Sequence, residues 1–175
     1  MIKKYSHILF IPLISVLFLS LSFSSEALNG KRSADGRYVD NGNEGTITDT
    51  KTGLTWAKKD SWADLGKCLD WNDSKIYVSN LNTGGHTDWR LPTVNELSAI
   101  YEKSKNHGMG FEYENFRSEF PLGLDSIFAD GAAYVFWSSE TIGSCCARYV
   151  TFVNGIVGKD LRDDCFGAGV RAVRR

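Results

Sequence analysis

Short stretches in which apolar and polar residues alternate predict β-strands near the start of the chain. Two such stretches, residues 37–40 and 46–49, flank a turn rich in Asn and Gly, and a third follows at residues 54–57. Because Asn and Gly favour tight turns between strands, the first two stretches are predicted to form a β-hairpin. The third is predicted as a separate strand that follows the hairpin.

The last quarter of the chain is also rich in β-branched and aromatic residues, and it predicts three strand regions: residues 133–139, 147–162 and 169–175. The middle region contains Asn-Gly at positions 154–155, the dipeptide that favours a two-residue type I′ turn. Such a turn would place Val153 opposite Ile156. The middle region is therefore predicted to be a hairpin.

Helical periodicity predicts two helices between these groups of strands. The first covers residues 72–81, and four of its residues share one face: Ser74, Tyr77, Val78 and Leu81. The second begins at Thr93, because Thr93 and Glu96 have the spacing of a capping box. Its predicted buried stripe consists of Val94, Leu97, Ile100 and Tyr101. Residues 58–70 are predicted to be an irregular insertion, and residues 106–131 a long loop packed by aromatic side chains.

Residues 1–27 have the pattern of a secretory signal peptide. Lys3 and Lys4 precede an apolar run over residues 8–23, and Ser25 and Ala27 supply small side chains for cleavage. The alternative is an uncleaved membrane anchor, because the run is long for a signal peptide and short for a span. Cleavage leaves no membrane span, and it predicts an exported protein in the periplasm, on the cell surface or secreted. A polar lead-in, residues 28–36, and a single domain, residues 37–175, would follow.

The charge balance argues against nucleic acid as a partner. The whole chain has a net charge of −1, and the part after residue 27 has 18 Lys and Arg against 20 Asp and Glu, a net charge of −2. Nucleic-acid-binding domains usually carry a strong excess of basic residues.

All four cysteines lie in the part predicted to be exported, which favours two disulfides. Zinc is the alternative, but the adjacent pair Cys145-Cys146 has poor spacing for two ligands. Four cysteines allow three pairings. A type I′ turn at positions 154–155 would place Cys146 opposite Asp163 and diagonal to Cys165, which favours a Cys146–Cys165 bridge and leaves Cys68–Cys145.

Two short motifs resemble calcium sites but fit structural roles better. Asp40 begins a run like an EF-hand loop, but Lys51 stands where the loop needs a bidentate Glu. Residues 71–73, Trp-Asn-Asp, match a calcium-binding triplet of C-type lectins, yet here they open a predicted helix, which Asn or Asp would cap. No phosphate-binding loop or assignable Ser/His/Asp set is present. We therefore predict no metal, no cofactor and no catalytic residues.

The stretch TDWRLPTVNEL, residues 87–97, is predicted to be structural. Thr93 and Glu96 cap a helix, and Pro92 keeps the preceding residue extended. Arg90 has two possible roles, and we favour a buried strut that binds a carboxylate or carbonyls over a contact to an anionic ligand. The predicted structural motif comprises Asp88, Trp89, Arg90, Leu91, Pro92, Thr93 and Glu96.

Taken in order, the stretches RYVDNGNEGTITDTKTGLTW, DWRLPTVNEL, FWSSE, VTFVNGIVG and VRAVR resemble the Lcl C-terminal domain family. These are exported bacterial domains named after the tail of a collagen-like adhesin that is associated with sulfated glycosaminoglycans. The resemblance implies an α+β protein with a C-type-lectin-like fold. In that fold an N-terminal hairpin pairs with the C-terminal strand, and two helices accompany a twisted antiparallel sheet.

The resemblance implies a non-catalytic recognition or adhesion domain at the cell envelope, whose ligand is a carbohydrate, with sulfated glycans among the candidates, or a protein. In lectin-like folds ligands bind the late strands and their loops. The candidate ligand-binding residues are therefore Trp137, Arg148, Tyr149, Lys159, Arg162 and Asp163. For each of them the alternative is structural: Trp137 in the core and the charges on a solvated hairpin. Two other functions remain open: an enzyme of the formylglycine-generating or thiol oxidoreductase type, and a structural envelope protein without a soluble ligand.

Overall fold

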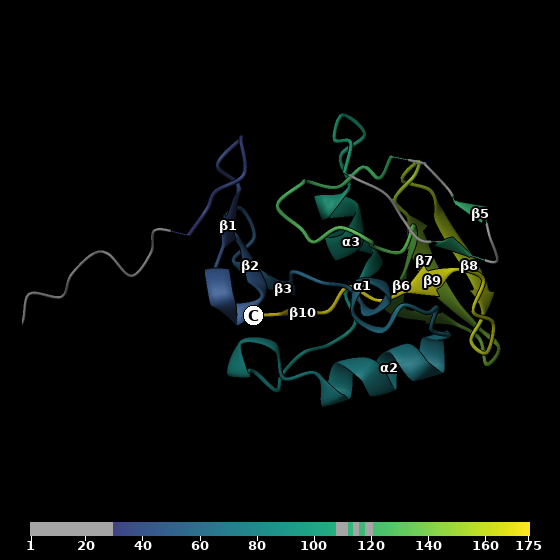
Figure 1. The fold of residues 1–175 in the computed structure, drawn as a ribbon. Coiled ribbons are helices and arrows are strands. Elements are labelled where there is room, and N and C mark those ends of the chain that lie inside the picture. Colours follow the sequence, from purple (N-terminus) through teal and green to yellow (C-terminus); the bar gives the residue numbers. More distant parts are fainter. Residues whose placement is uncertain (1–29, 108–111, 114–115, 118–120) are drawn as a thin grey trace, which may run out of the picture.

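Two four-stranded sheets and three α-helices make up the described part of the chain in the computed structural model (Figure 1). The structure describes residues 30–107, 112–113, 116–117 and 121–175. The predicted signal peptide, residues 1–27, lies outside the described residues. The combination of helices with antiparallel and mixed sheets confirms the α+β class.

The first sheet joins the two ends of the domain. It contains β1 (Tyr38–Asp40), β2 (Thr46–Asp49), β3 (Leu54–Ala57) and β10 (Val173–Arg174), in the order β1-β2-β3-β10, with every pair antiparallel. A 3-10 helix, η2 (Gly42–Glu44), forms the turn between β1 and β2. The predicted hairpin is confirmed, but the C-terminal strand β10 pairs with β3, the strand that follows the hairpin, and not with the hairpin itself.

The second sheet is mixed. It contains β6 (Val135–Ile142), β7 (Cys146–Thr151), β8 (Val157–Leu161) and β9 (Ala168–Gly169), in the order β8-β7-β6-β9. The pairs β8–β7 and β7–β6 are antiparallel, whereas β6 and β9 are parallel. The prediction of an antiparallel sheet thus holds for three of these strands. A two-stranded ribbon, β4 (Glu112–Tyr113) with β5 (Phe116–Arg117), interrupts the stretch predicted as one long loop.

The β7–β8 turn differs from the predicted two-residue turn. Cys146 pairs with Leu161, not with Asp163, and the loop spans the four residues 152–155. The reason is Phe152, which is fully buried and packs edge-on against Phe136 at 4.8 Å between ring centroids. Core packing of this ring removes residue 152 from the ladder, so the local preference of Asn-Gly for a tight turn is overridden.

Three α-helices accompany the sheets: α1 (Ser61–Leu65), α2 (Trp71–Asn80) and α3 (Val94–Ile100). The last two match the predicted helices, and a 3-10 helix, η3 (Thr83–Gly85), follows α2. The capping box of α3 is confirmed, because the Glu96 N–H donates to Thr93 Oγ1 at 3.1 Å and the Thr93 N–H donates to Glu96 Oε2 at 2.8 Å. Helix α1 was missed within the predicted irregular insertion. It is a single turn capped by Asp60, too short to show periodicity.

The second sheet separates two apolar clusters. On one face, Phe136 and Val150 belong to the same cluster as Leu97 and Ile100 of α3. On the other, Trp137 and Ala147 belong with residues of α2 such as Val78. Neighbouring residues of β6 therefore point to opposite sides of the sheet, as strand geometry requires.

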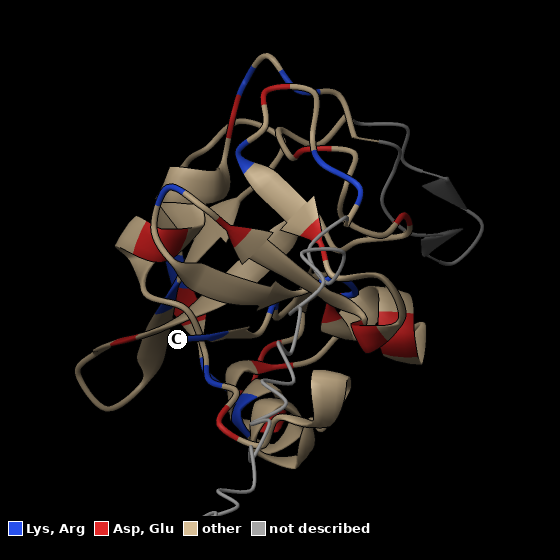
Figure 2. Ribbon diagram, turned by 90° about the vertical axis from the view of Figure 1, so that its left-hand side faces the viewer, with Lys and Arg blue, Asp and Glu red and all other residues tan. Residues whose placement is uncertain are grey.

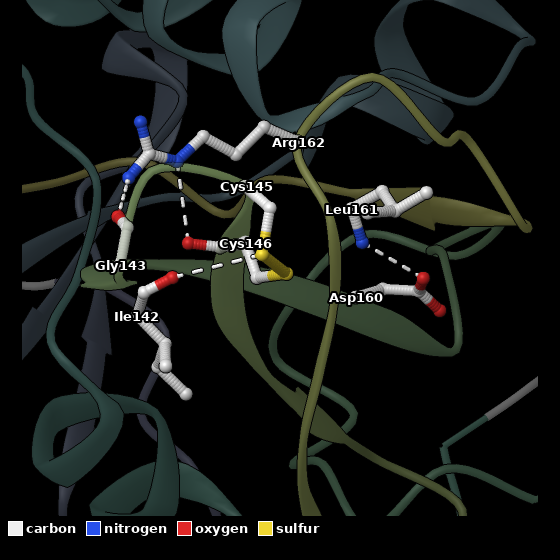
Figure 3. Close-up of a disulfide and its surroundings, with 7 residues drawn as sticks. All are labelled: Ile142, Gly143, Cys145, Cys146, Asp160, Leu161 and Arg162. Carbon is white, nitrogen blue, oxygen red and sulfur yellow. Dashed lines mark hydrogen bonds between the residues drawn. A yellow bond between two sulfur atoms is a disulfide. The ribbon is translucent and has the colours of Figure 1, made fainter.

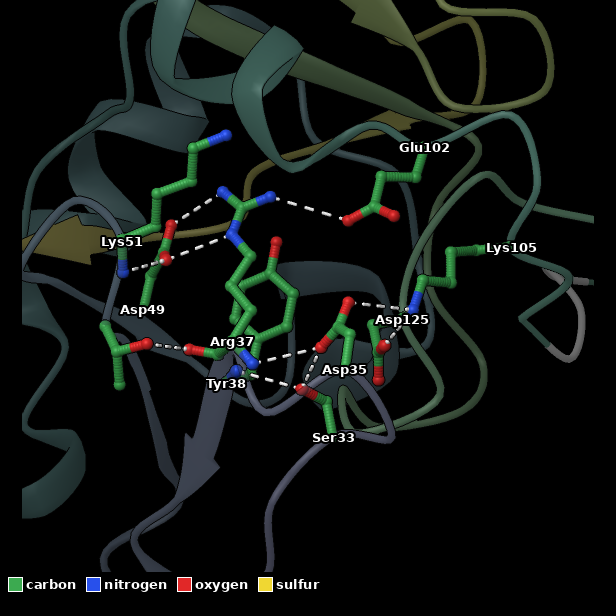
Figure 4. A network of polar contacts seen from close by, with 10 residues as sticks. Ser33, Asp35, Arg37, Tyr38, Asp49, Lys51, Glu102, Lys105 and Asp125 are labelled. Atoms are coloured by element: carbon green, nitrogen blue, oxygen red, sulfur yellow. Dashed lines mark hydrogen bonds and ion pairs between the residues drawn. The ribbon is translucent and has the colours of Figure 1, made fainter.

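A polar network ties the chain that precedes β1 to the rest of the domain (Figure 4). Arg37 donates two hydrogen bonds to Asp49, from Nε at 3.0 Å and from Nη2 at 2.7 Å, and lies 3.4 Å from Glu102. Lys105 bridges Asp35 at 3.2 Å and Asp125 at 2.8 Å. Burial alone would raise the pKa of Asp49, but the hydrogen bonds from Arg37, from Thr52 and from the Lys51 N–H, together with the Arg37 charge, outweigh it and lower the pKa below the usual 3.8.

The Arg37–Asp49 pair should make stability depend on acidic pH. Because the pKa of Asp49 is lower in the folded chain, the unfolded chain binds the proton first, and this stabilisation is lost as pH falls through the folded pKa. Between about pH 6 and pH 3 we expect the wild type to lose about 1 kcal/mol more than Asp49→Asn, measured by urea unfolding. Equal losses in the two proteins would contradict this assignment.

Candidate functional site

Strand β8 forms an edge of the second sheet and exposes aliphatic side chains. Its burial alternates, so that Val157, Lys159 and Leu161 are exposed while the residues between them are half-buried. Val157 is 41% exposed and Leu161 49%. An edge strand with exposed aliphatic residues is unusual, because proteins normally protect such edges from association.

The pairing register places further residues beside these three. Residues directly opposite in an antiparallel ladder point to the same face. Lys159 faces Arg148, Leu161 faces Cys146, and Cys146 in turn faces Ile142 on β6. We call this surface the β8 face, and it comprises Ile142, Cys146, Arg148, Val157, Lys159 and Leu161.

The centre of the β8 face is positively charged. Arg148 and Lys159 are directly opposite, an arrangement that is unfavourable for like charges. The Arg148 guanidinium lies 3.9 Å from a carboxylate oxygen of Glu140, and both side chains are more than 40% exposed. The other Glu140 oxygen accepts a 2.9 Å hydrogen bond from the N–H of Val94 at the start of α3. One shared carboxylate therefore offsets the two cations only in part. On the side of the molecule that faces the viewer in Figure 2, which is the left-hand side of Figure 1, basic and acidic residues are interspersed.

Both predicted disulfide pairings are wrong. The bridges are Cys68–Cys165 and Cys145–Cys146, and none of the four cysteines is free. The altered β7–β8 register moves Cys165 beyond the end of the ladder. The segment before α2 runs beside β9, where the Leu69 N–H donates to the Ala168 carbonyl at 3.0 Å, and this brings Cys68 to Cys165 with 5.7 Å between their Cα atoms.

The adjacent disulfide Cys145–Cys146 lies in the β6–β7 turn at the end of the β8 face (Figure 3). The Arg162 side chain holds this turn in place by hydrogen bonds to its backbone. Its Nε donates to the Cys146 carbonyl at 3.2 Å, and its Nη2 donates to the Gly143 carbonyl at 2.8 Å. Its guanidinium also lies over the Trp71 ring, 5.0 Å from the centroid. The donors of Arg162, a predicted ligand contact, are thus used within the protein.

The structure does not bring the other predicted ligand-binding residues together. Trp137 is fully buried and its Nε1 donates to the Leu69 carbonyl at 3.0 Å, so its prediction as a surface contact is wrong. Tyr149 points to the face opposite Arg148 and lies between Trp137 and Phe166, with centroids 6.0 and 5.1 Å away. Asp163 is exposed in the turn after β8. Only Arg148 and Lys159 of the six share a surface.

The glycine of β8 has a packing role that the sequence did not reveal. The Tyr149 ring lies directly over Gly158, and a Cβ atom at that position would overlap the ring. Gly158 therefore allows Tyr149 to fold against the sheet on the side away from the β8 face.

The TDWRLPTVNEL stretch makes contacts within the domain, but Arg90, predicted to be buried, is not. Its side chain is 39% exposed and binds Glu96 with both terminal nitrogens, at 2.7 and 2.8 Å. Its backbone pairs with Val173 of β10. Asp88 binds Arg174 at 2.7 Å, a link between this stretch and the C-terminal strand. Trp89 and Leu91 are buried, as predicted for core residues.

Among the described residues, no group of three or more His, Cys, Asp or Glu side chains is placed to hold a metal ion. None of the described helices combines the length and the apolar character needed to cross a membrane. A hollow of about 420 Å³ lies between α1 and α2 and includes exposed Leu65 and Ile76. It is wide open and carries both charge signs, Asp64 and Asp73 beside Lys67.

The fold and the exposed sheet edge define a small α+β domain whose most distinctive surface is aliphatic and basic. The family model of the Lcl C-terminal domain matches residues 45–174, most of the chain. The protein therefore belongs to the Lcl C-terminal domain family. A comparison with curated proteins found no match.

Proposed function

We propose that this chain is an exported, non-catalytic recognition domain that binds its ligand on the β8 face. The observation that carries the proposal is the clustering of exposed aliphatic residues. Six large hydrophobic side chains are exposed in the described part of the chain, and four of them lie on the β7–β8 hairpin: Val157 and Leu161 on the β8 face, and Val153 and Ile156 in the turn next to it. Contiguous exposed apolar residues beside charged ones are typical of interaction sites.

The chemistry of the β8 face favours a protein ligand over a carbohydrate. Exposed Trp and Tyr rings are the usual apolar contacts for a ligand that stays partly hydrated when bound, as a carbohydrate does. Here Trp137 is buried and Tyr149 lies half-buried on the opposite face of the sheet. The β8 face instead offers Val157 and Leu161, which suit the aliphatic side chains of a polypeptide.

We further propose that the fold is C-type-lectin-like and that the protein acts outside the cytoplasm. The sheet that joins the N-terminal hairpin, through β3, to the C-terminal strand β10 supports the fold. Two disulfides support an oxidising compartment, since such bonds are rare where thiols are kept reduced. Residues 1–27 have the pattern of a secretory signal peptide, which would direct export of the chain.

The proposed function can be tested with the purified exported chain against a glycan array and a displayed library of random peptides. We expect peptides, not glycans, to be selected, because the β8 face lacks exposed aromatic anchors. Val157→Ser with Leu161→Ser should weaken binding of the selected peptides at least about tenfold, since two aliphatic contacts are lost.

Ile76→Ser is the matched control, because Ile76 is exposed to a similar extent, 59%, on α2. Its binding should equal that of the wild type. Selection of glycans alone, or equal weakening by the α2 variant, would contradict binding at the β8 face.

A further inference from the structure

We propose that the free edge of β8 accepts an extended peptide strand whose central residue is acidic and whose second neighbours on either side are aliphatic. This inference rests on the proposed function and specifies its ligand. It combines three features of the β8 face: unpaired backbone groups, an alternating pattern of side chains and an incompletely balanced positive charge.

The ladder with β7 determines which backbone groups of β8 face outward. The Thr151 N–H donates to the Ile156 carbonyl at 2.9 Å, and at the other end the Arg162 N–H donates to the Cys145 carbonyl at 3.0 Å. In an antiparallel ladder, residues that bond to the partner alternate with residues that point away. The even-numbered residues 156–162 therefore bond to β7, and Val157, Lys159 and Leu161 direct their N–H and carbonyl groups away from it.

The far end of this edge is closed by the chain itself. The Leu161 N–H donates to Asp160 Oδ1 at 2.8 Å, and the Leu161 carbonyl accepts from the Asp164 N–H at 3.4 Å. Within the part of the chain that the structure describes, the groups of β8 left to pair with an added strand are those of Val157 and Lys159. A short extended segment fits this edge, and its backbone supplies affinity while alternate side chains supply specificity.

The side chains of the β8 face determine what the added strand should carry. Strand residues that point to one face recur every second position, so the added strand presents side chains beside Val157, Lys159 and Leu161 in turn. Aliphatic residues match the two ends. A carboxylate matches the middle, because Lys159 and Arg148 face each other there, and among the described residues the ion pair of Arg148 is with the shared Glu140.

The same charges disfavour a second copy of this chain as the occupant. Pairing of β8 with β8 of a copy would bring two Lys159 and two Arg148 side chains onto one face, and the two Glu140 carboxylates would offset these four cations only in part. Like charges at such spacing oppose association, and a lysine on an edge strand is a common protection against self-pairing. The carboxylate of an acidic peptide would instead be attracted to Lys159 and Arg148.

The test uses the exported chain and two labelled synthetic peptides, Thr-Val-Thr-Glu-Thr-Val-Thr and the same peptide with a central Lys, with binding measured by fluorescence anisotropy. We expect the Glu peptide to bind at least about tenfold more tightly, with an advantage that shrinks as salt rises. Lys159→Glu should reverse the preference. Lys103→Glu, the same charge change at an exposed residue away from β8, should preserve it.

The outcomes separate this inference from the proposed function. If both peptides bind equally and only the variant with serine at positions 157 and 161 loses binding, the β8 face is the site but the acidic specificity is wrong. If the Glu peptide binds as well after N-methylation of alternate backbone amides, in each of the two registers, strand addition is wrong. If neither peptide binds and sedimentation shows a dimer disrupted by Val157→Ser with Leu161→Ser, the occupant is a second copy and the inference is overturned.

Discussion

Replacing Asp60 by alanine is expected to lower the free energy of unfolding by about 3–5 kcal/mol, because it leaves the buried Arg171 guanidinium without its carboxylate partner. Both side chains are fully buried, and Arg171 Nη2 lies 3.2 Å from Asp60 Oδ2. Asp60 also accepts hydrogen bonds from the N–H groups of Ala63 at 2.8 Å and Ala133 at 3.0 Å. The substitution therefore leaves a charge and two N–H groups unpaired at once.

Electrostatics explains why the two charges depend on each other. Burial raises the pKa of Asp60 and lowers the pKa of Arg171, so each charged form is disfavoured by desolvation and is held by its surroundings. Arg171 also donates to the carbonyls of Ala57 and Lys58, and its guanidinium lies 4.7 Å from the centroid of the Phe128 ring. The pair thus links α1, the end of β3 and the chain before β10.

Urea unfolding of Asp60→Ala and of the double variant Asp60→Ala with Arg171→Met provides the measurement. We expect the double variant to recover part of the lost stability. Replacing both members of a buried ion pair by apolar groups often destabilises a protein less than removing one member alone. Asp130→Ala, which removes an exposed carboxylate, should change stability by less than about 0.5 kcal/mol. A loss below about 1 kcal/mol in Asp60→Ala would show that the pair is not needed for the fold.

Locally encoded elements were predictable from the sequence, and elements that depend on distant residues were not. The capping box of Thr93 and Glu96 lies within four residues, and it formed as predicted. Arg90 was predicted to be the buried arginine, but that role belongs to Arg171, whose partner Asp60 is 111 positions away in the chain. No local pattern distinguishes the two arginines, because the burial of each depends on what the folded chain brings next to it.

The candidate site was predictable in part for the same reason. Alternation placed Arg148 and Lys159 on a hairpin, and the structure brings them opposite each other on an exposed face. Trp137 obeys the same alternation on the neighbouring strand, yet α2 and the chain before it cover that face of the sheet. The turn after β7 was mispredicted because Phe152 is buried in the core and is therefore not part of the ladder. The longer turn changes the register of β7 with β8, and the predicted disulfide pairing depended on the register of a two-residue turn.

Removing the Cys68–Cys165 disulfide by serine substitution at both positions should lower the free energy of unfolding by about 4 kcal/mol. The bridge joins residues separated by 97 positions, and a cross-link over so long a loop restricts the unfolded chain strongly. It also fastens the segment before α2 to the segment before β9, where the Leu69 N–H bonds to the Ala168 carbonyl. Thermal and urea unfolding under non-reducing conditions would measure the loss.

The second disulfide provides a matched control for that variant. Cys145 and Cys146 are adjacent, so their bridge closes no long loop, and the turn keeps the hydrogen bonds donated by Arg162 to the Cys146 and Gly143 carbonyls. Serine at both positions should therefore cost less than about 1 kcal/mol. Equal losses in the two double variants would mean that loop closure is not the source of the stabilisation. The contrast expected instead assigns the Cys68–Cys165 bridge to the stability of the fold and the adjacent pair to the local shape of the turn at the end of the β8 face.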